Sequence, residues 1–111
     1  MEYTLTGGGF SAKVKSHGAE LVSFKSGDKE YIWQGDAAYW AGQNPNLFPN
    51  IGAVKPYGIY FDGKSYPLMR HGFARHSQFT LVEKGEDFVV LELRENETTL
   101  EQYPFSFSLY V

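Results

Sequence analysis

The residues best suited to chemistry gather in one stretch, LMRHGFARHSQF, at positions 68–79, which holds two of the chain's three histidines. His71 can give or accept a proton near neutral pH, and Arg75 offers a fixed fork of donors for hydroxyl, carboxylate or phosphate oxygens. Between them, Gly72 permits a sharp turn and Phe73 can anchor the loop in a core. The same residues would also suit a surface turn with a capping histidine and an arginine paired to a glutamate. Residue type alone leaves both interpretations open.

A metal site is not predicted at this stretch. His71 and His76 are five positions apart, whereas paired histidines on one face of a helix are about four apart. Gly72 weakens a helix there, and no acidic residue lies nearby in the sequence to complete a zinc site. The run GGG at 7–9 lacks the following Gly-Lys-Ser/Thr of a phosphate loop, so we interpret it as a hairpin turn. No metal is expected.

A second polar stretch, NPNLFPNIG at 44–52, lies upstream. Its prolines stiffen the backbone, and its asparagines could present several amides to a pocket. Amides beside aromatic faces suit a sugar, which has hydroxyl edges and apolar C–H faces. Three aromatic residues could complete such a surface, although core packing is the usual role of a single tryptophan: Trp33, Trp40 and Tyr57. This composition favours a carbohydrate over a nucleotide or a lipid.

The elements that must position these residues have the period of strands. At 105–111, Phe105, Phe107, Leu109 and Val111 alternate with Ser106, Ser108 and Tyr110, which places the first set on one face. Glycine-rich turns separate the alternating segments. Such a pattern predicts a single all-β domain at 1–111, an antiparallel β-sandwich or barrel. One short helical segment is expected at 36–41, and strands are expected at 3–6, 10–15, 21–25, 31–34, 58–61, 79–82, 87–94 and 105–111.

The composition excludes several classes of protein. The net charge of −3 gives no basic face for a nucleic acid, and the lack of cysteine excludes disulfides and thiolate sites. The first residues do not resemble a signal peptide, and no apolar run approaches the length of a membrane span. A cytoplasmic protein without a nucleic-acid or membrane partner is therefore expected.

Four motifs occur in an order that resembles a known family: HGAEL at 17–21, NPNLFPNIG at 44–52, HGFAR at 71–75 and YPFSFSLYV at 103–111. Together they look like the N-terminal part of the aldose 1-epimerase, or galactose mutarotase-like, family, closest to the bacterial branch with the LacX-type proteins. The resemblance covers essentially the whole chain. The pair LFP and HGFAR is fairly specific, whereas HGAEL alone is weak.

The resemblance implies a large antiparallel β-sandwich, the galactose mutarotase-like supersandwich, of which residues 1–111 would be an incomplete N-terminal portion. The family interconverts the α and β anomers of an aldose. A general base takes the proton of the anomeric hydroxyl while a general acid protonates the ring oxygen, which opens the ring without a cofactor. His71 matches the first of two active-site histidines, and its implied catalytic role is to hydrogen-bond the sugar and stabilise charge near the ring oxygen.

The sequence also departs from the family. The glutamate base and the second histidine of the family lie beyond position 111, so the resemblance implies that these residues alone are inactive. Family chains are much longer. The resemblance therefore indicates a truncated chain, a proteolytic fragment or a degenerate relative. A non-catalytic carbohydrate-binding module on the same fold is the alternative function.

The expected ligand is a small-molecule aldose or sugar phosphate. Galactose-type enzymes carry an arginine near the position of Asn46, and Arg75 matches one of two phosphate-binding arginines of sugar-phosphate variants. The other would fall near Ala41, which favours a free aldose, although Arg70 could supply the missing charge. The expected substrate-binding residues are Arg75, Asn46 and Arg70, while His17 and His76 are expected on the surface. Exposed sheet edges favour homo-oligomers.

Overall fold

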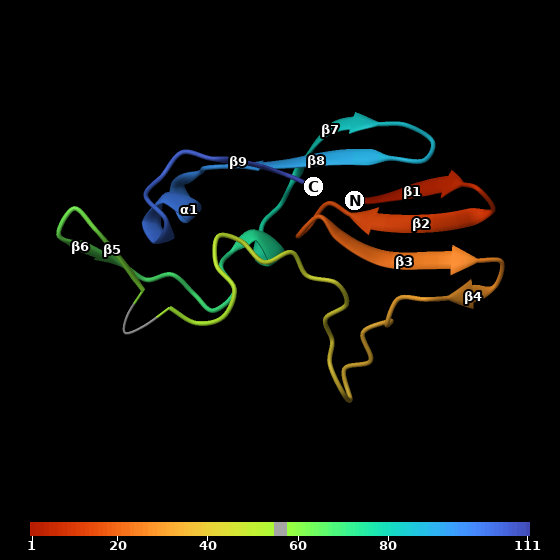
Figure 1. Cartoon of the computed structure of the whole chain (residues 1–111), viewed down its shortest axis with the longest axis horizontal. Coiled ribbons are helices and arrows are strands. Elements are labelled where there is room, and N and C mark those ends of the chain that lie inside the picture. Colours follow the sequence, from red (N-terminus) through yellow and green to blue (C-terminus); the bar gives the residue numbers. More distant parts are fainter. Residues whose placement is uncertain (55–57) are drawn as a thin grey trace.

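The computed structural model describes residues 1–54 and 58–111 and is built from antiparallel strands (Figure 1). The predicted all-β fold is confirmed. A four-stranded sheet has the order β1 (Glu2–Gly7), β2 (Phe10–Lys15), β3 (Glu20–Ser26), β4 (Lys29–Glu30). A two-stranded sheet pairs β5 (Ile59–Phe61) with β6 (Lys64–Tyr66). A three-stranded sheet has the order β7 (Thr80–Lys84), β8 (Val89–Arg94), β9 (Ser108–Tyr110).

Glycine turns close the hairpins as the sequence predicts. Gly7 pairs with Phe10 across a two-residue loop in which Gly8 and Gly9 both have positive φ, at 57° and 81°. This backbone matches the right-handed twist of the flanking strands and is disfavoured for residues with a Cβ. Asp62 and Gly63 close the β5–β6 hairpin in the same way, with φ of 51° and 74°.

The predicted strand at 31–34 is wrong. The Tyr31 amide still donates to the Phe24 carbonyl (2.9 Å), but the Glu30 carboxylate accepts from the Phe24 amide that would complete this pair (2.9 Å). It also accepts from the Ile32 amide (2.9 Å), and the backbone leaves the sheet after β4. The helix expected at 36–41 is only a turn, in which the amides of Tyr39 and Trp40 both donate to the carbonyl of Asp36.

One helix was not predicted, α1 (Glu97–Gln102). Its N-terminus is a capping box in which the Asn96 side chain accepts from the Thr99 amide and the Thr99 hydroxyl accepts from the Asn96 amide. This arrangement satisfies donors that would otherwise lack partners. The helix lies between β8 and β9 and lets the chain return to pair Arg94 with Ser108.

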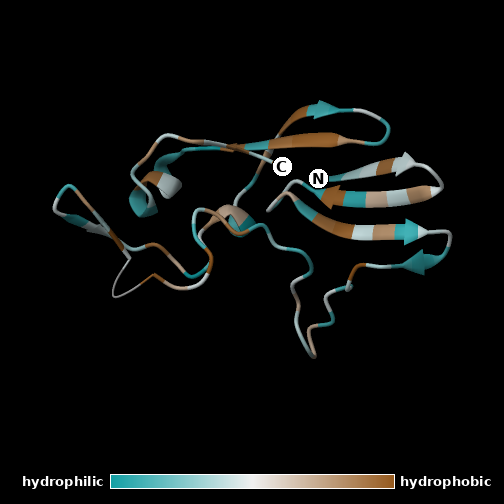
Figure 2. Cartoon of the chain, in the orientation of Figure 1, coloured by the Kyte–Doolittle hydropathy of each residue, from teal (hydrophilic) through white to brown (hydrophobic). Residues whose placement is uncertain are grey.

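The buried core joins β8, with Leu91 at 0% and Leu93 at 3% exposure, to residues 68–79, which contribute Leu68, Phe73, Ala74 and Phe79. The alternation predicted at 105–111 holds as far as Leu109, since Phe105, Phe107 and Leu109 are half-buried and the residues between them exposed. Val111, expected on the same face, is 43% exposed. The strand itself is shorter than predicted, spanning Ser108–Tyr110. Figure 2 shows apolar residues concentrated along β8 and in parts of β2 and β3.

The molecule is a flattened layer. Its extents are 54 × 35 × 18 Å and its radius of gyration is 16.3 Å. A compact domain of this length would have a radius of gyration of roughly 13 Å. Several apolar side chains therefore remain on open surface rather than in a closed core.

Candidate functional site

Two loops meet to form the candidate site, which we call the His71 corner: residues 46–52 and residues 68–76. Phe48 and Gly72 form an isolated parallel bridge. The carbonyl of Phe48 accepts from the amides of Phe73 (2.9 Å) and Ala74 (3.2 Å). The segment ends in a 3₁₀ helix, η1 (Ala74–His76). The structure thus brings together two stretches that fifteen residues, 53–67, separate in the sequence.

Gly72 allows this close approach. A Cβ at this position would lie 2.0 Å from the carbonyl oxygen of Phe48, and φ of Gly72 is +69°. Space and backbone conformation both exclude a side chain here. The prediction that Gly72 supports a sharp turn is confirmed.

An aromatic cluster lies against the two loops. Phe73, which is 3% exposed, packs with Phe48 (ring centroids 6.0 Å apart), Phe107 (5.8 Å) and Tyr103 (6.4 Å). Tilted and edge-on rings at such distances stabilise beyond the area they bury. Phe73 anchors the loop in the core, as predicted, and fixes the backbone beside His71.

His71 is held by a reciprocal pair of hydrogen bonds to Gly52. Its backbone amide donates to the Gly52 carbonyl (2.9 Å), and the Gly52 amide donates to His71 Nδ1 (2.8 Å). The residue is half-buried and has φ of +64°, an uncommon conformation for a residue other than glycine. His71 is therefore fixed at its backbone and at one ring nitrogen, Nδ1.

Asn50 braces the loop that carries Gly52. Its Nδ2 donates to the carbonyl of Gly52 (2.8 Å) and, at 3.4 Å, to that of Met69. Its Oδ1 is buried and accepts no hydrogen bond from the described residues. Sequence reasoning assigned no individual role to Asn50 or Gly52. The three-residue pattern Asn-x-Gly is too common to indicate a site by itself.

The two arginines lie at the ends of the same loop. Arg75 is half-buried and its Nη2 donates to the Arg70 carbonyl at 3.3 Å, which curls the guanidinium back over residues 70–75. Its Nε is buried without a partner among the described residues. Arg70 and His76 are exposed. Two cationic side chains thus flank His71 on one loop.

Asn46 is tied to the turn after β2. Its Nδ2 donates to the carbonyls of Gly18 (2.9 Å) and Ala19 (2.8 Å), so both amide hydrogens are used within the chain. The Arg75 backbone also packs closely against Gly18, because a Cβ on Gly18 would lie 2.8 Å from the Arg75 carbonyl oxygen. The HGAEL motif, weak as a sequence signal, is the part of the chain that holds Asn46 and Arg75 in place.

Glu20 fixes the start of the upstream loop, a role the sequence did not reveal. Its Oε1 accepts from the amides of Asn44 (2.7 Å) and Gln43 (3.2 Å), and its Oε2 pairs with Lys15 Nζ at 2.6 Å. Burial raises the pKa of Glu20, but the hydrogen bonds and charge of these partners outweigh burial and lower the pKa below its ordinary value. Glu20 is thus an ionised anchor for residues 43–44.

Two of the three aromatic residues proposed as a sugar-facing surface, Trp33 and Trp40, lie apart from the core. Trp33 is 44% and Trp40 53% exposed, and Trp33 Nε1 donates to the Trp40 carbonyl at 2.8 Å. Tyr57 lies outside the described residues. The tryptophans belong to the excursion between β4 and the upstream loop, and neither has the core-packing role that is usual for tryptophan.

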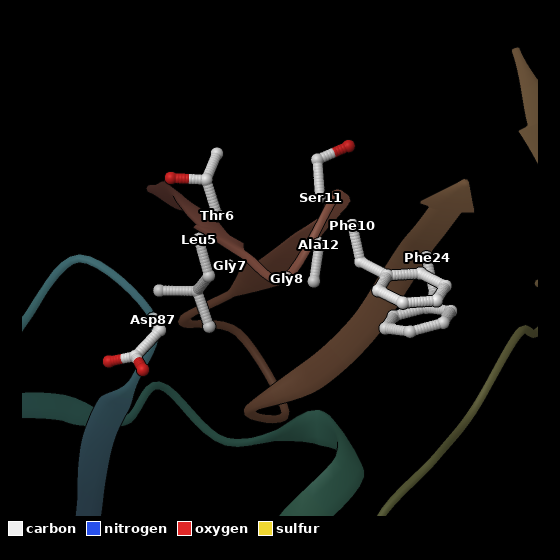
Figure 3. A pocket seen from close by; sticks show the side chains of 9 residues that line it. All are labelled: Leu5, Thr6, Gly7, Gly8, Phe10, Ser11, Ala12, Phe24 and Asp87. Atoms are coloured by element: carbon white, nitrogen blue, oxygen red, sulfur yellow. The ribbon is translucent and has the colours of Figure 1, made fainter. Parts of the chain in front are cut away.

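A separate depression of about 300 Å³ lies beside the β1–β2 turn (Figure 3). Phe10 and Phe24, whose ring centroids are 5.3 Å apart, form one side of it, and Asp87 lies on another. Asp87 is the one charged residue among those that line it. The depression therefore lacks the convergent polar groups that the His71 corner provides.

Across residues 1–54 and 58–111, no group of three or more acidic, histidine or cysteine residues is placed to hold a metal ion. Within the same residues, no helix is long and apolar enough to cross a membrane.

The chain is thus an antiparallel β protein whose candidate site places a histidine between two arginines on a braced loop. Comparison identifies the family. The family model described as aldose 1-epimerase matches residues 1–111, so the chain belongs to the aldose 1-epimerase family.

Three relatives illustrate the similarity. The plasmid-encoded protein LacX of Lactococcus lactis subsp. lactis is 36% identical over 107 residues, which covers 91% of this chain and 36% of LacX. The galactose mutarotase related enzyme of Lactobacillus acidophilus superposes with a TM-score of 0.95 at 35% identity, covering 99% of this chain and 37% of that one. A galactose mutarotase-like protein of Lactobacillus casei ATCC 334 gives 0.93 at 33%, covering 99% and 38%. The chain thus spans little more than a third of the relatives it matches.

Proposed function

We propose that the chain supplies the sugar-binding wall of an aldose 1-epimerase that interconverts the α and β anomers of an aldose. The observation that carries the proposal is the His71 corner, where a braced histidine and Arg75 share one loop within a chain of this family. Fixed donors at a site where charge develops stabilise a transition state, because they need no reorganisation during the reaction.

The four proposed site residues have distinct roles. His71 donates from Nε2 toward the ring oxygen of the sugar, and Arg75 donates to hydroxyl oxygens from the guanidinium nitrogens that do not bond Arg70. Arg70, which is exposed, reaches a second hydroxyl or a phosphate. Asn46 uses its Nδ2 within the chain, so its contact with a sugar falls to Oδ1. A free aldose is the proposed substrate.

The general base and general acid of ring opening are proposed to come from outside these residues. Both groups are needed, since the anomeric hydroxyl loses a proton as the ring oxygen gains one. His71 Nδ1 is already an acceptor for the Gly52 amide, which leaves the histidine one free nitrogen. The chain alone is therefore expected to bind sugar without turning it over.

A non-catalytic carbohydrate-binding module is the second candidate. It is favoured by the same observation, since the described corner offers donors for a sugar and lacks a paired acid and base. The two functions differ in turnover only.

Polarimetry separates them. Residues 1–111 would replace the matching segment of the galactose mutarotase related enzyme of Lactobacillus acidophilus, and the approach of fresh α-galactose or α-glucose to anomeric equilibrium would be followed. We expect acceleration by this chimera, a loss of roughly 10²-fold in His71→Ala, and no change in His76→Ala, an exposed histidine. The chain alone should leave the rate unchanged. Sugar-dependent shifts at Arg75 without turnover by the chimera would favour the binding module.

A further inference from the structure

The bond between Gly52 and His71 determines which ring nitrogen carries a hydrogen. A backbone amide can only donate, so Nδ1, at 2.8 Å from the Gly52 nitrogen, must be the acceptor. In the neutral ring the hydrogen then resides on Nε2. A proton added to Nδ1 would face the Gly52 amide, donor against donor, and the bond would break.

The Gly52 peptide is itself held in position. Its carbonyl accepts from two donors, the His71 amide at 2.9 Å and Asn50 Nδ2 at 2.8 Å. Its φ is +82°, and no atom lies within 4 Å of the place where a Cβ would be. Glycine is therefore needed here for conformation rather than for space. The Asn50 brace fixes that conformation, since its second contact at Met69 spans to the loop that carries His71.

Asn50 does more than fill a turn. Its Oδ1 is buried and accepts no hydrogen bond from the described residues, so the hydrogen bonds of this side chain to the described residues are made through Nδ2. Reversing the amide would set Oδ1 against two carbonyl oxygens, those of Gly52 and Met69. The orientation of the Asn50 amide is thus set by the two carbonyls that its Nδ2 bonds, and its Oδ1 is left without a partner among the described residues.

We propose that Asn50 is a positioning residue that acts through Gly52 to keep Nδ1 of His71 as a hydrogen-bond acceptor and the ring hydrogen on Nε2. His71 is then a hydrogen-bond donor to the sugar and not a proton acceptor. This inference rests on the proposed function for its sugar, but the tautomer and the hydrogen bond are properties of the chain without ligand.

The test is nuclear magnetic resonance of the ¹⁵N-labelled 111-residue chain. A scalar coupling across the hydrogen bond should join the Gly52 amide nitrogen to His71 Nδ1, and the ring hydrogen should be found on Nε2. In Asn50→Ala the coupling should be lost or more than halved, while Asn44→Ala, which removes an exposed asparagine side chain, should leave it unchanged. Asn50→Asp keeps the shape of the side chain, removes the donor and should also lose the coupling.

Three results would overturn the proposal: no coupling in the unmodified chain, a hydrogen on Nδ1, or an unchanged coupling in both Asn50 variants. If Asn50→Ala does not fold, Asn50→Asp and the unmodified chain still decide. These outcomes are independent of polarimetry. A chimera without mutarotase activity would contradict the proposed function while the coupling stood, and a missing coupling in an active chimera would contradict only the role of Asn50.

Discussion

The His71 corner and the open apolar surface, formed by Leu5, Phe10, Phe24, Phe88 and Val111, differ in how complete they are. In the corner, Phe73 is 3% exposed and the loop backbones are joined by direct hydrogen bonds. On the open apolar surface, Phe10 is 45%, Phe88 41% and Val111 43% exposed. These residues line two neighbouring depressions that share Leu5.

The difference shows that a loop site and a sheet face are stabilised by different interactions. Loops at the corner are fixed by a few directional bonds and by glycines that permit close approach, all of which the chain supplies. A sheet face is stabilised by the apolar area that is covered, and in a layer 18 Å thick much of that area stays open. The corner can therefore be formed in a chain whose sandwich is not closed.

The largest contrast is expected between phenylalanines of the two regions. Phe73→Ala should destabilise the chain by about 3–5 kcal/mol, because it removes a buried ring from the aromatic cluster. Phe10→Ala should cost about 1 kcal/mol, since the half-exposed ring loses mainly its stacking on Phe24. Urea denaturation of both variants measures the difference. Equal costs would mean that the corner is no better packed than the open surface.

Glycine substitutions sharpen the comparison within turns. Gly63→Ala should cost roughly 1–2 kcal/mol, the penalty of a left-handed backbone, since nothing lies within 4 Å of its Cβ position. Gly72→Ala has a similar φ but would place Cβ 2.0 Å from the Phe48 carbonyl oxygen, so its cost should rise toward about 4 kcal/mol. Thermal or urea unfolding gives both values. The interpretation of a contact-limited turn fails if the two variants are equally stable.

Removing the charge of Glu20 should loosen the upstream loop. Glu20→Gln weakens hydrogen bonds to the Gln43 and Asn44 amides and the pair with Lys15, and should cost about 1.5–3 kcal/mol. The exposed Glu101→Gln of α1 is the control and should change stability by less than about 0.5 kcal/mol.

The same carboxylate predicts a pH dependence. The pKa of Glu20 is lower in the folded chain than its ordinary value of 4.5, so its contribution is fully present above pH 4.5 and is lost as pH falls through the folded pKa. Denaturation as a function of pH should show this loss, and Glu20→Gln should flatten the curve between pH 4.5 and lower values. An unchanged acid slope in the variant would contradict the role of Glu20 as an ionised anchor.

The smallest effect on stability is expected at the open apolar surface itself. Val111→Lys should change the free energy of unfolding by less than about 0.5 kcal/mol, but it should reduce self-association, because charge opposes pairing at exposed apolar edges. Sedimentation over a range of concentrations measures this. Leu100→Lys, on α1 and similarly exposed at 41%, should leave association unchanged. A monomer at all concentrations would contradict the expected homo-oligomer.

Much of the fold could be predicted because period-two alternation and glycine turns are local signals. They predicted β1, β2 and β3 and the buried face of β8. The strand at 31–34 failed because the Glu30 side chain takes backbone donors, which no alternation pattern reveals. α1 was missed because a six-residue helix depends on its cap, and Asn96 and Thr99 read equally well as loop residues.

The candidate site was predictable only in part. Sequence motifs selected both loops and His71, while the contacts of these residues with a sugar stay predictions. Glu20 and Gly52 were missed because their hydrogen bonds join them to residues far away in sequence. Asn50 was missed because its bond to Gly52, two residues on, matters only through the contact of Gly52 with His71. Such partners depend on how the loops fold together, which residue type does not encode.

The left-handed backbone of His71 restricts what evolution or engineering can place there. With φ of +64°, most side chains would add strain, whereas asparagine, aspartate and glycine tolerate this conformation better. A variant library at position 71 should therefore be enriched, on the basis of folding alone, in asparagine rather than in the glutamine or lysine that a chemist would choose to mimic a donor. Asparagine would keep the turn and offer a short amide in place of the ring. Substitutions at this one position could therefore separate selection for stability from selection for the imidazole.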